Sequence, residues 1–189
     1  EAAKKFDAVK VFSNFFANEE QTLKKQAQID AQNKKIYLEK YKPIIEAKIA
    51  YFNKLKETCY TTRSGLQFAI IKKGNGKKPV EGADIFINYA GFLEDGTLFD
   101  TSIEKVANEF GKLDKQRSLA KQYIPIPFQA GKKEGMIPGF IEGIEQLAYG
   151  DKAVLFIPSK LGFAEAGAGE VIPPNANLIF EVELMTPKN

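Results

Sequence analysis

Few residue types in this chain of 189 residues are able to do covalent chemistry. It has no His, which excludes serine-type triads, imidazole general bases and histidine metal sites. Its one cysteine, Cys59, can form neither an internal disulfide nor a cysteine zinc site. The glycine-rich runs at 74–76 and 167–169 lack the Gly-Lys-Thr/Ser of a phosphate loop. We therefore predict no metal and no cofactor. The 15 Phe, 7 Tyr and the carboxylates remain as material for a site that binds by packing.

Composition divides the chain near residue 60. Residues 1–60 contain no Gly and one Pro, whereas the remainder holds all 15 Gly. The hydrophobic share of 44% and charged share of 27% are typical of a globular protein. The formal net charge of +3 is too small to indicate nucleic-acid binding. We expect two parts, 1–60 and 61–189, with a boundary near Thr58–Ser64.

The first part is rich in Ala, Lys, Glu, Gln and Leu, which favours helix. Proline suits the first turn of a helix better than its interior. We therefore predict a long helix to about Lys40, a break, and a second helix from about Pro43 to Thr58. Two helices alone cannot bury an aromatic stripe, so it should meet either the second part or another copy of the chain. That stripe comprises Phe6, Phe12, Phe15 and Phe16.

The second part alternates apolar and polar residues in short runs separated by turn signals. Glu94-Asp95-Gly96 marks a hairpin, and Pro138 opens a short helix that closes near Gly150. One short helix against these strands predicts an α+β fold, an antiparallel half-barrel sheet wrapped on that helix. Residues 102–124 are a polar insertion that forms either a lip beside the neighbouring residues or a decorated loop without a role. The predicted strands are 66–72, 84–92, 97–100, 153–157 and 178–184.

Five runs in the second part carry a longer pattern. They are SGLQF at 64–68, INYAGFLEDGTLFD at 87–100, MIPGFIEGIEQLAYGDKA at 136–153, FIPSKLGF at 156–163 and VIPPNANLIFEVELM at 171–185. In order and spacing they closely resemble the FKBP-type peptidyl-prolyl cis–trans isomerases, apart from the insertion after Thr101. The resemblance implies catalysis of X–Pro bond rotation in folding proteins, with proline-containing polypeptides as substrates and immunosuppressant macrolides as inhibitors.

The resemblance also implies a site. It assigns catalytic roles to four residues, which are Tyr89, Asp100, Phe140 and Phe163. It assigns substrate binding to eight further residues, which are Phe99, Ile126, Phe128, Met136, Ile137, Val171, Ile172 and Phe180.

Four positions depart from the family's usual residues. Ile126 stands where an aromatic residue is usual, and Phe140 stands in place of Trp. Phe163 stands in place of Tyr and lacks its hydroxyl, so we expect weakened macrolide binding and reduced isomerase activity. Ala164 replaces a usual Gly, so the flap at 161–170 is expected to be set differently.

Two other functions compete with an active isomerase. In the first, the predicted site binds proline-containing segments without useful turnover, and the N-terminal helices act as a holdase chaperone or assembly arm. In the second, the domain is a vestigial scaffold. Envelope members of this family often carry a helical dimerisation region, so the resemblance implies a possible homodimer through residues 1–60. It also implies a periplasmic protein or outer-membrane lipoprotein of a Gram-negative bacterium, with a cytoplasmic location as the alternative. The chain begins at Glu1, which we expect to reflect processing or trimming.

Overall fold

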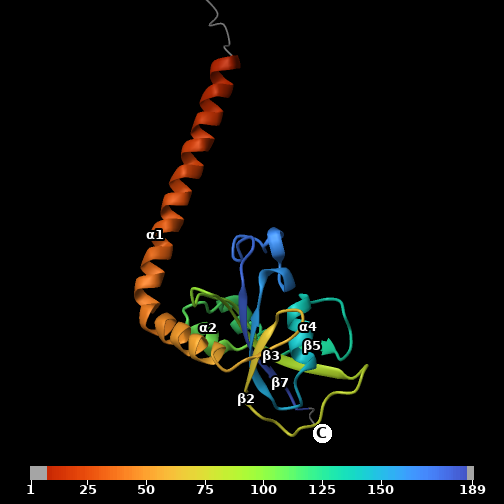
Figure 1. Cartoon of the computed structure of the whole chain (residues 1–189). Helices are drawn as coiled ribbons and strands as arrows, with labels where there is room; N and C mark the ends of the chain where they lie inside the picture. Colours follow the sequence, from red (N-terminus) through yellow and green to blue (C-terminus); the bar gives the residue numbers. More distant parts are fainter. Residues whose placement is uncertain (1–7, 187–189) are drawn as a thin grey trace, which may run out of the picture. The chain divides into compact units, whose positions relative to one another are not determined.

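The computed structural model describes residues 8–186, with side chains from Phe16 onward (Figure 1). The chain divides into two compact units, residues 1–42 and 43–189. Its helices are α1 (Ala8–Lys56), α2 (Glu104–Glu109), α3 (Lys115–Leu119) and α4 (Pro138–Glu145), with short 3-10 turns η1 (Ser159–Leu161) and η2 (Ala164–Ala166). Its strands are β1 (Tyr60–Thr61), β2 (Gln67–Lys72), β3 (Asp84–Leu93), β4 (Leu98–Thr101), β5 (Ile126–Gln129), β6 (Lys152–Ile157) and β7 (Leu178–Leu184).

The predicted break near Pro43 is wrong, because α1 is a single helix with Pro43 inside it. An interior proline removes one helical hydrogen bond and costs about 3 kcal/mol. Burial of Ile45 and Phe52 in the following turns offsets this cost, since each buried side chain contributes about 1.5–3 kcal/mol. No helix within residues 8–186 is long and apolar enough to cross a membrane.

The first unit holds the N-terminal part of α1. Its apolar side chains are exposed, with Phe16 at 63%, Leu23 at 67% and Ile36 at 54%. The rest of the predicted aromatic stripe, Phe6, Phe12 and Phe15, lies outside the described side chains. Among the described side chains these residues remain exposed, so the expectation that another surface covers the stripe stays a prediction.

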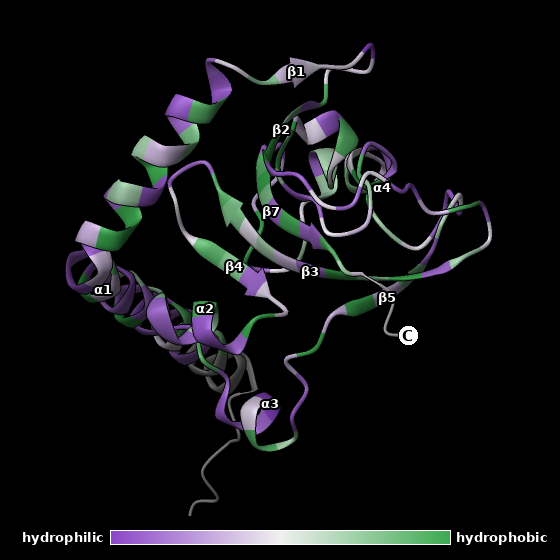
Figure 2. Cartoon of the chain, turned by 90° about the horizontal axis from the view of Figure 1, so that it is seen from below, coloured by the Kyte–Doolittle hydropathy of each residue, from purple (hydrophilic) through white to green (hydrophobic). Residues whose placement is uncertain are grey.

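The second unit is built on one antiparallel sheet in the order β1-β2-β6-β7-β3-β4, with β5 also paired to β3 (Figure 2). This confirms the predicted α+β fold. The hairpin at 94–96 is also confirmed, because the Leu93 amide donates to the Thr97 carbonyl at 2.9 Å. Gly96 has φ +76, and a Cβ there would approach Ile45 Cγ2 within 2.9 Å. Glycine is therefore needed at position 96 both because φ is positive and because a Cβ would clash with Ile45 of α1. The helix α4 ends at Glu145, earlier than predicted.

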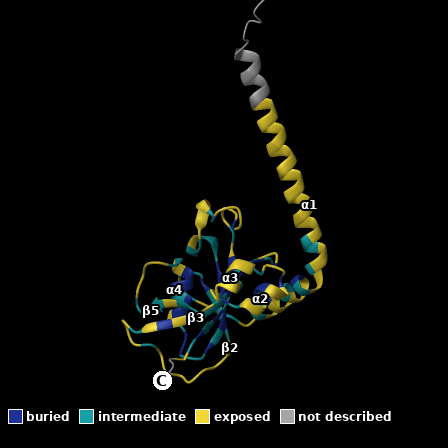
Figure 3. Cartoon of the chain, turned by 180° about the vertical axis from the view of Figure 1, so that it is seen from behind, coloured by how far each residue is buried: buried dark blue, intermediate teal, exposed yellow. Residues whose placement is uncertain are grey.

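Both faces of this sheet carry a core, and Figure 3 shows the buried residues gathered in the strands and α4. On the inner face Ile144 and Leu147 pack with Leu155 of β6. Successive strand side chains point to opposite faces, so Phe156 points to the outer face. There it meets Phe52 of α1, with ring centroids 6.2 Å apart. The outer core thus includes the C-terminal part of α1, which lies within the second unit.

The insertion joins two strands on the same edge of β3. β4 pairs with Ala90–Phe92 and β5 pairs with Asp84–Ile87, both along that edge. Residues 102–124 therefore leave the sheet at the end of β4 and return just before Ile126. Two short helices, α2 and α3, fill the interval.

Candidate active site

A cavity of about 380 Å³ opens on the inner face, beside the start of α4. Eleven of the twelve residues predicted for the site line it, and Ala168 is the one additional lining residue. The eleven are Tyr89, Phe99, Asp100, Ile126, Met136, Ile137, Phe140, Phe163, Val171, Ile172 and Phe180. Side chains separated by up to 91 positions therefore converge on one hollow.

Phe180 is the centre of an aromatic wall. Its ring centroid lies 5.1 Å from that of Phe140, 5.5 Å from that of Phe99 and 6.2 Å from that of Tyr89. The first two pairs are edge-to-face, the arrangement that ring quadrupoles favour. Gly91 makes this possible, because a Cβ there would come within 2.4 Å of Phe99 and 3.0 Å of Phe180.

The strand registry explains how these residues meet. Gly91 of β3 pairs with Asp100 on one side and with Phe180 on the other. The buried hydroxyls of Thr101 and Ser102 fix the neighbouring strand. Thr101 donates to the Tyr89 carbonyl at 2.7 Å, and the Tyr89 amide donates to Ser102 Oγ at 2.9 Å. The segment Phe-Asp-Thr-Ser at 99–102 thus hydrogen-bonds the end of β4 to the backbone of Tyr89 in β3.

The floor of the cavity comes from the first turn of α4. Pro138 occupies the start of this helix, where its missing N–H costs nothing. The Phe140 amide donates to the Ile137 carbonyl at 3.0 Å, and the Phe140 ring is 4% exposed. Met136 and Ile137 precede the helix and line the cavity with it.

Asp100 is the one acid in the lining, and two side chains hold it. The Tyr89 hydroxyl donates a short hydrogen bond to Asp100 Oδ2. Arg117 donates from Nη1 to Asp100 Oδ1 at 2.9 Å and from Nη2 to the Thr101 carbonyl at 3.2 Å. Partial burial, followed by the bond to Asp100, raises the pKa of Tyr89 far above its usual range. Tyr89 therefore remains a neutral donor at every ordinary pH.

Arg117 was not predicted, and it comes from the insertion. Asp114 caps α3 by accepting from the amides of Gln116 and Arg117, at 2.8 and 3.0 Å. The Arg117 guanidinium lies 4.5 Å from the Tyr123 ring centroid. The only signal in the sequence is that Arg117 is one of two arginines in the chain, the other being Arg63. The insertion is thus an ordered element that reaches the carboxylate.

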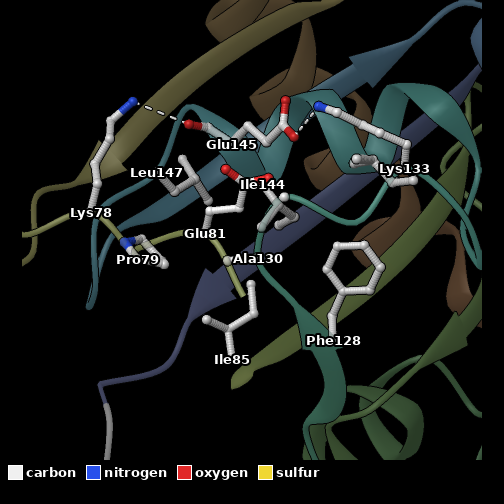
Figure 4. A pocket seen from close by; sticks show the side chains of 12 residues that line it. Lys78, Pro79, Glu81, Ile85, Phe128, Ala130, Lys133, Ile144, Glu145 and Leu147 are labelled. Carbon is white, nitrogen blue, oxygen red and sulfur yellow. Dashed lines mark hydrogen bonds and ion pairs between the residues drawn. The ribbon is translucent and has the colours of Figure 1, made fainter. Parts of the chain in front are cut away.

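Phe128 is the one predicted site residue that lies apart from the other eleven. It lines a different cavity, together with Ile85, Ile144 and Leu147 (Figure 4). Ile126 and Phe128 share a face of β5, opposite Ile87 and Ile85 respectively. Residues two apart on a strand are about 6.8 Å apart, however. Ile126 therefore reaches the aromatic cavity, whereas Phe128 lies beyond it.

The flap over the cavity follows β6. Ile172 is buried and exchanges two backbone hydrogen bonds with Ala168, whereas Val171 is 56% exposed and Phe163 is 36% exposed. Ala164 adopts φ +47, a left-handed conformation that costs an L-residue about 1–2 kcal/mol. Ala164 thus takes a conformation typical of glycine, and its carbonyl accepts from the Asn175 amide at 2.7 Å.

The chemistry of this lining is that of binding. The twelve lining residues include no Ser, Thr, Cys, Lys or His. The one hydroxyl, on Tyr89, is bonded to Asp100, and its raised pKa keeps it protonated, so it is not activated as a nucleophile. Across residues 16–186, no three His, Cys, Asp or Glu side chains gather into a metal site. The lining suits an apolar ring next to an amide, with one carboxylate facing the polar part.

Comparison with known proteins agrees with this geometry. The family model of FKBP-type peptidyl-prolyl cis–trans isomerases matches residues 75–185, more than half of the chain. A probable FKBP-type peptidyl-prolyl cis-trans isomerase, FkpA, of Neisseria meningitidis is 37% identical over 133 residues, which is 70% of this chain and 42% of that protein. An FK506-binding protein of the same species is 38% identical over 121 residues, 64% of this chain and 94% of its own length.

A solved structure extends the likeness to the helical part. The crystal structure of FkpA from Escherichia coli superposes with a TM-score of 0.56 at 26% identity, covering 97% of this chain and 74% of that one. In sequence, the chain spans about half or less of the length of the FkpA-type relatives it matches. On these grounds the chain belongs to the FKBP-type peptidyl-prolyl cis–trans isomerase family.

Proposed function

We propose that the protein accelerates cis–trans rotation of X–Pro bonds in polypeptide substrates, with the aromatic cavity as its active site. The uncatalysed rotation crosses a barrier of about 18–20 kcal/mol because amide resonance resists twisting. No bond breaks, so a catalyst needs only to bind the twisted amide better than either planar isomer. Lowering the barrier by about 5–7 kcal/mol supplies roughly 10⁴–10⁵-fold.

The lining offers the interactions that this selectivity requires. The proline ring is apolar and packs against Phe140 at the floor. The planar amide is more polar than the twisted one, so transfer from water to an aromatic cavity disfavours the planar state. Asp100, held by Tyr89 and Arg117, faces the region where the amide would lie. The convergence of Asp100 with the four-ring wall in one open cavity is the observation that carries the proposal.

An isomerase assay on a proline-containing peptide tests the proposal. We expect the full chain to accelerate the exchange, and Asp100→Val to lower kcat/KM at least several-fold. Asp84→Val is the matched control, because Asp84 is an exposed strand acid outside the aromatic cavity. No acceleration by the wild-type protein would refute the proposal. If that protein nevertheless suppressed aggregation of an unfolded client, the alternative of a proline-binding holdase would replace it.

We also propose that the protein forms a homodimer through the N-terminal helix. Phe16, Leu23 and Ile36 are exposed on α1, and they are spaced at near-heptad intervals that suit a helix–helix seam. Sedimentation should give a dimer mass for the wild type and a monomer mass for Leu23→Lys. Lys25→Ala, a polar change two residues away, should leave the dimer intact. A monomeric wild-type protein would contradict this part of the proposal.

Location and inhibitors follow from the same family likeness. We propose that the protein acts in the bacterial envelope and that macrolide inhibitors bind it weakly. Fractionation of cells that produce the native protein tests the location, and a cytoplasmic signal would contradict it.

A further inference from the structure

Part of β2 lies at an edge of the sheet, with no neighbouring strand on one side among the described residues. β1 is the outermost strand, and its two residues pair with Phe68 and Gln67. On the other side β2 pairs with β6 as far as Lys72. Among the described residues, no strand lies next to Ala69–Lys72 on the β1 side.

The alternation of strand hydrogen bonds shows which backbone groups face that place. The Thr62 amide donates to the Leu66 carbonyl at 2.8 Å across the β1 side. The amide and carbonyl of one residue point to the same edge of an antiparallel strand, and successive residues alternate. Those of Phe68 and Ile70 therefore also point to the β1 side. Phe68 has Tyr60 opposite it, whereas the register of β1 provides no residue opposite Ile70.

An apolar groove lies against the same edge. It has a volume of about 490 Å³ and is lined by Tyr51, Leu55, Thr58, Tyr60, Ala69, Ile70 and Ile71. Tyr60 is 70% exposed and Ile71 is 43% exposed. Ile70 packs on the inner core, so Ala69 points to the outer face. Ile71, at the β-bulge, lines the groove together with Tyr51 and Leu55 of α1. Apolar side chains and unpaired backbone groups thus occur together.

We propose that this edge binds an extended, apolar segment of another polypeptide as an added strand. The backbone of an extended segment supplies a donor and an acceptor at the spacing that Ile70 presents, and alternate side chains of the added strand would enter the groove. A β-bulge between Ile70 and Lys72 ends the regular pairing, so the docking edge is short and the binding is weak. Lys72 and Lys73 are exposed just beyond it, which favours a segment with an acidic residue at that end.

This site is separate from the aromatic cavity, and the proposal does not depend on isomerase activity. The two lining sets share no residue. A substrate that reached both would be held at a second point away from its proline. Pairing through the backbone is largely independent of sequence, which suits varied unfolded chains.

Backbone NMR of the full chain with a synthetic peptide tests the proposal. The probe is a proline-free peptide of alternating Val and Thr with one terminal Glu. We expect amide shifts centred on Ile70 and saturable binding in the high micromolar to millimolar range. N-methylation of the residues on one side of the peptide backbone should weaken binding at least tenfold. N-methylation of the residues on the other side, with the same number of methyl groups, should change it little.

Variants supply an independent comparison. Ile71→Lys should weaken binding at least fivefold, because it places a charge in the groove. Val80→Lys is the matched control, since Val80 is 73% exposed and outside the groove. Equal affinity of the two methylated peptides would overturn the proposal even if Ile71→Lys failed to fold. Shifts confined to the aromatic cavity, absence of binding at millimolar peptide, or self-association through this edge would overturn it as well.

Discussion

Two clusters of aromatic rings lie on opposite faces of one sheet, and they differ in what surrounds them. The outer cluster consists of Phe52, Phe92, Phe110 and Phe156, all 5% exposed or less. Its ring centroids are 5.3 to 6.2 Å apart, much like those of the inner cluster. The inner cluster borders a cavity of about 380 Å³, whereas α1 and α2 cover the outer one.

Ring packing alone therefore does not distinguish core from site. The inner cluster adds a carboxylate held by two partners, and its rings line an open cavity. Lys48 lies beside the outer cluster, with its ammonium 5.3 Å from the Phe92 ring, and it pairs with Glu181 at 3.0 Å. Lys48 is paired beside a buried core, whereas Asp100 lines the open aromatic cavity.

The largest effect that we predict is on stability in the outer cluster. Phe52→Ala should lower the free energy of unfolding by about 3–5 kcal/mol, because it leaves a cavity in a closed core. Urea denaturation measures this change. Phe86→Ala, at a ring that is 49% exposed, should cost far less. Isomerase activity of folded Phe52→Ala should stay close to that of the wild type, and a large loss of activity would show that the two clusters are coupled.

The next prediction separates the clusters by activity. Phe140→Leu should lower kcat/KM about tenfold, equivalent to about 1.4 kcal/mol, because the aromatic floor loses its ring contacts. Phe110→Leu makes the same replacement at a ring that is 2% exposed in the outer cluster. Both variants should lose similar stability, but only the first should lose activity. Equal loss of activity in both would remove the functional distinction.

Macrolide affinity tests the open rim of the inner cluster. Phe163→Tyr adds a hydroxyl at a position that is 36% exposed, where it remains solvated until a ligand binds. One new hydrogen bond contributes about 0.5–1.5 kcal/mol, so we expect FK506 to bind about 2–12-fold more tightly. Isothermal titration calorimetry measures the change. Phe99→Tyr, at another ring of the lining, serves as the control, and unchanged affinity of Phe163→Tyr would refute this account of the position.

The insertion should have a smaller effect on activity. Arg117→Ala frees Asp100 from one of its two partners, and both side chains of this pair are partly exposed, at 34% and 43%. Pairs of this kind contribute about 0–1 kcal/mol, so kcat/KM should fall by up to about fivefold. Lys115→Ala, on the same helix, should have no effect. If Arg117→Ala had the kcat/KM of the wild type while Asp100→Val lost activity, the contact from the insertion would have no role in catalysis.

Arg117 also shows where prediction from the sequence ends. The hairpin, the short helix and the strands β2, β3, β4, β6 and β7 were predictable because apolar alternation and turn residues act locally, whereas the short strands β1 and β5 were not predicted. The cavity residues were predictable because the motifs that carry them are colinear with the family's. Arg117 was not predictable, because its approach to Asp100 depends on how 23 inserted residues fold. The break at Pro43 was predicted wrongly, because burial of the following turns outweighed the local preference of proline. Phe128 stands outside the cavity because strand spacing places it beyond Ile126.

The smallest predicted effect concerns pH. Burial and the bond to Asp100 raise the pKa of Tyr89 in the folded protein above its unfolded value of about 10. The resulting stabilisation is fully present below pH 10 and declines as the pH rises further, because tyrosines of the unfolded chain then ionise. The stability advantage of the wild type over Tyr89→Phe should therefore become smaller as the pH rises from 7 to 10.5. A difference that widened over this range would mean that folded Tyr89 ionises readily, which contradicts its role as a permanent donor to Asp100.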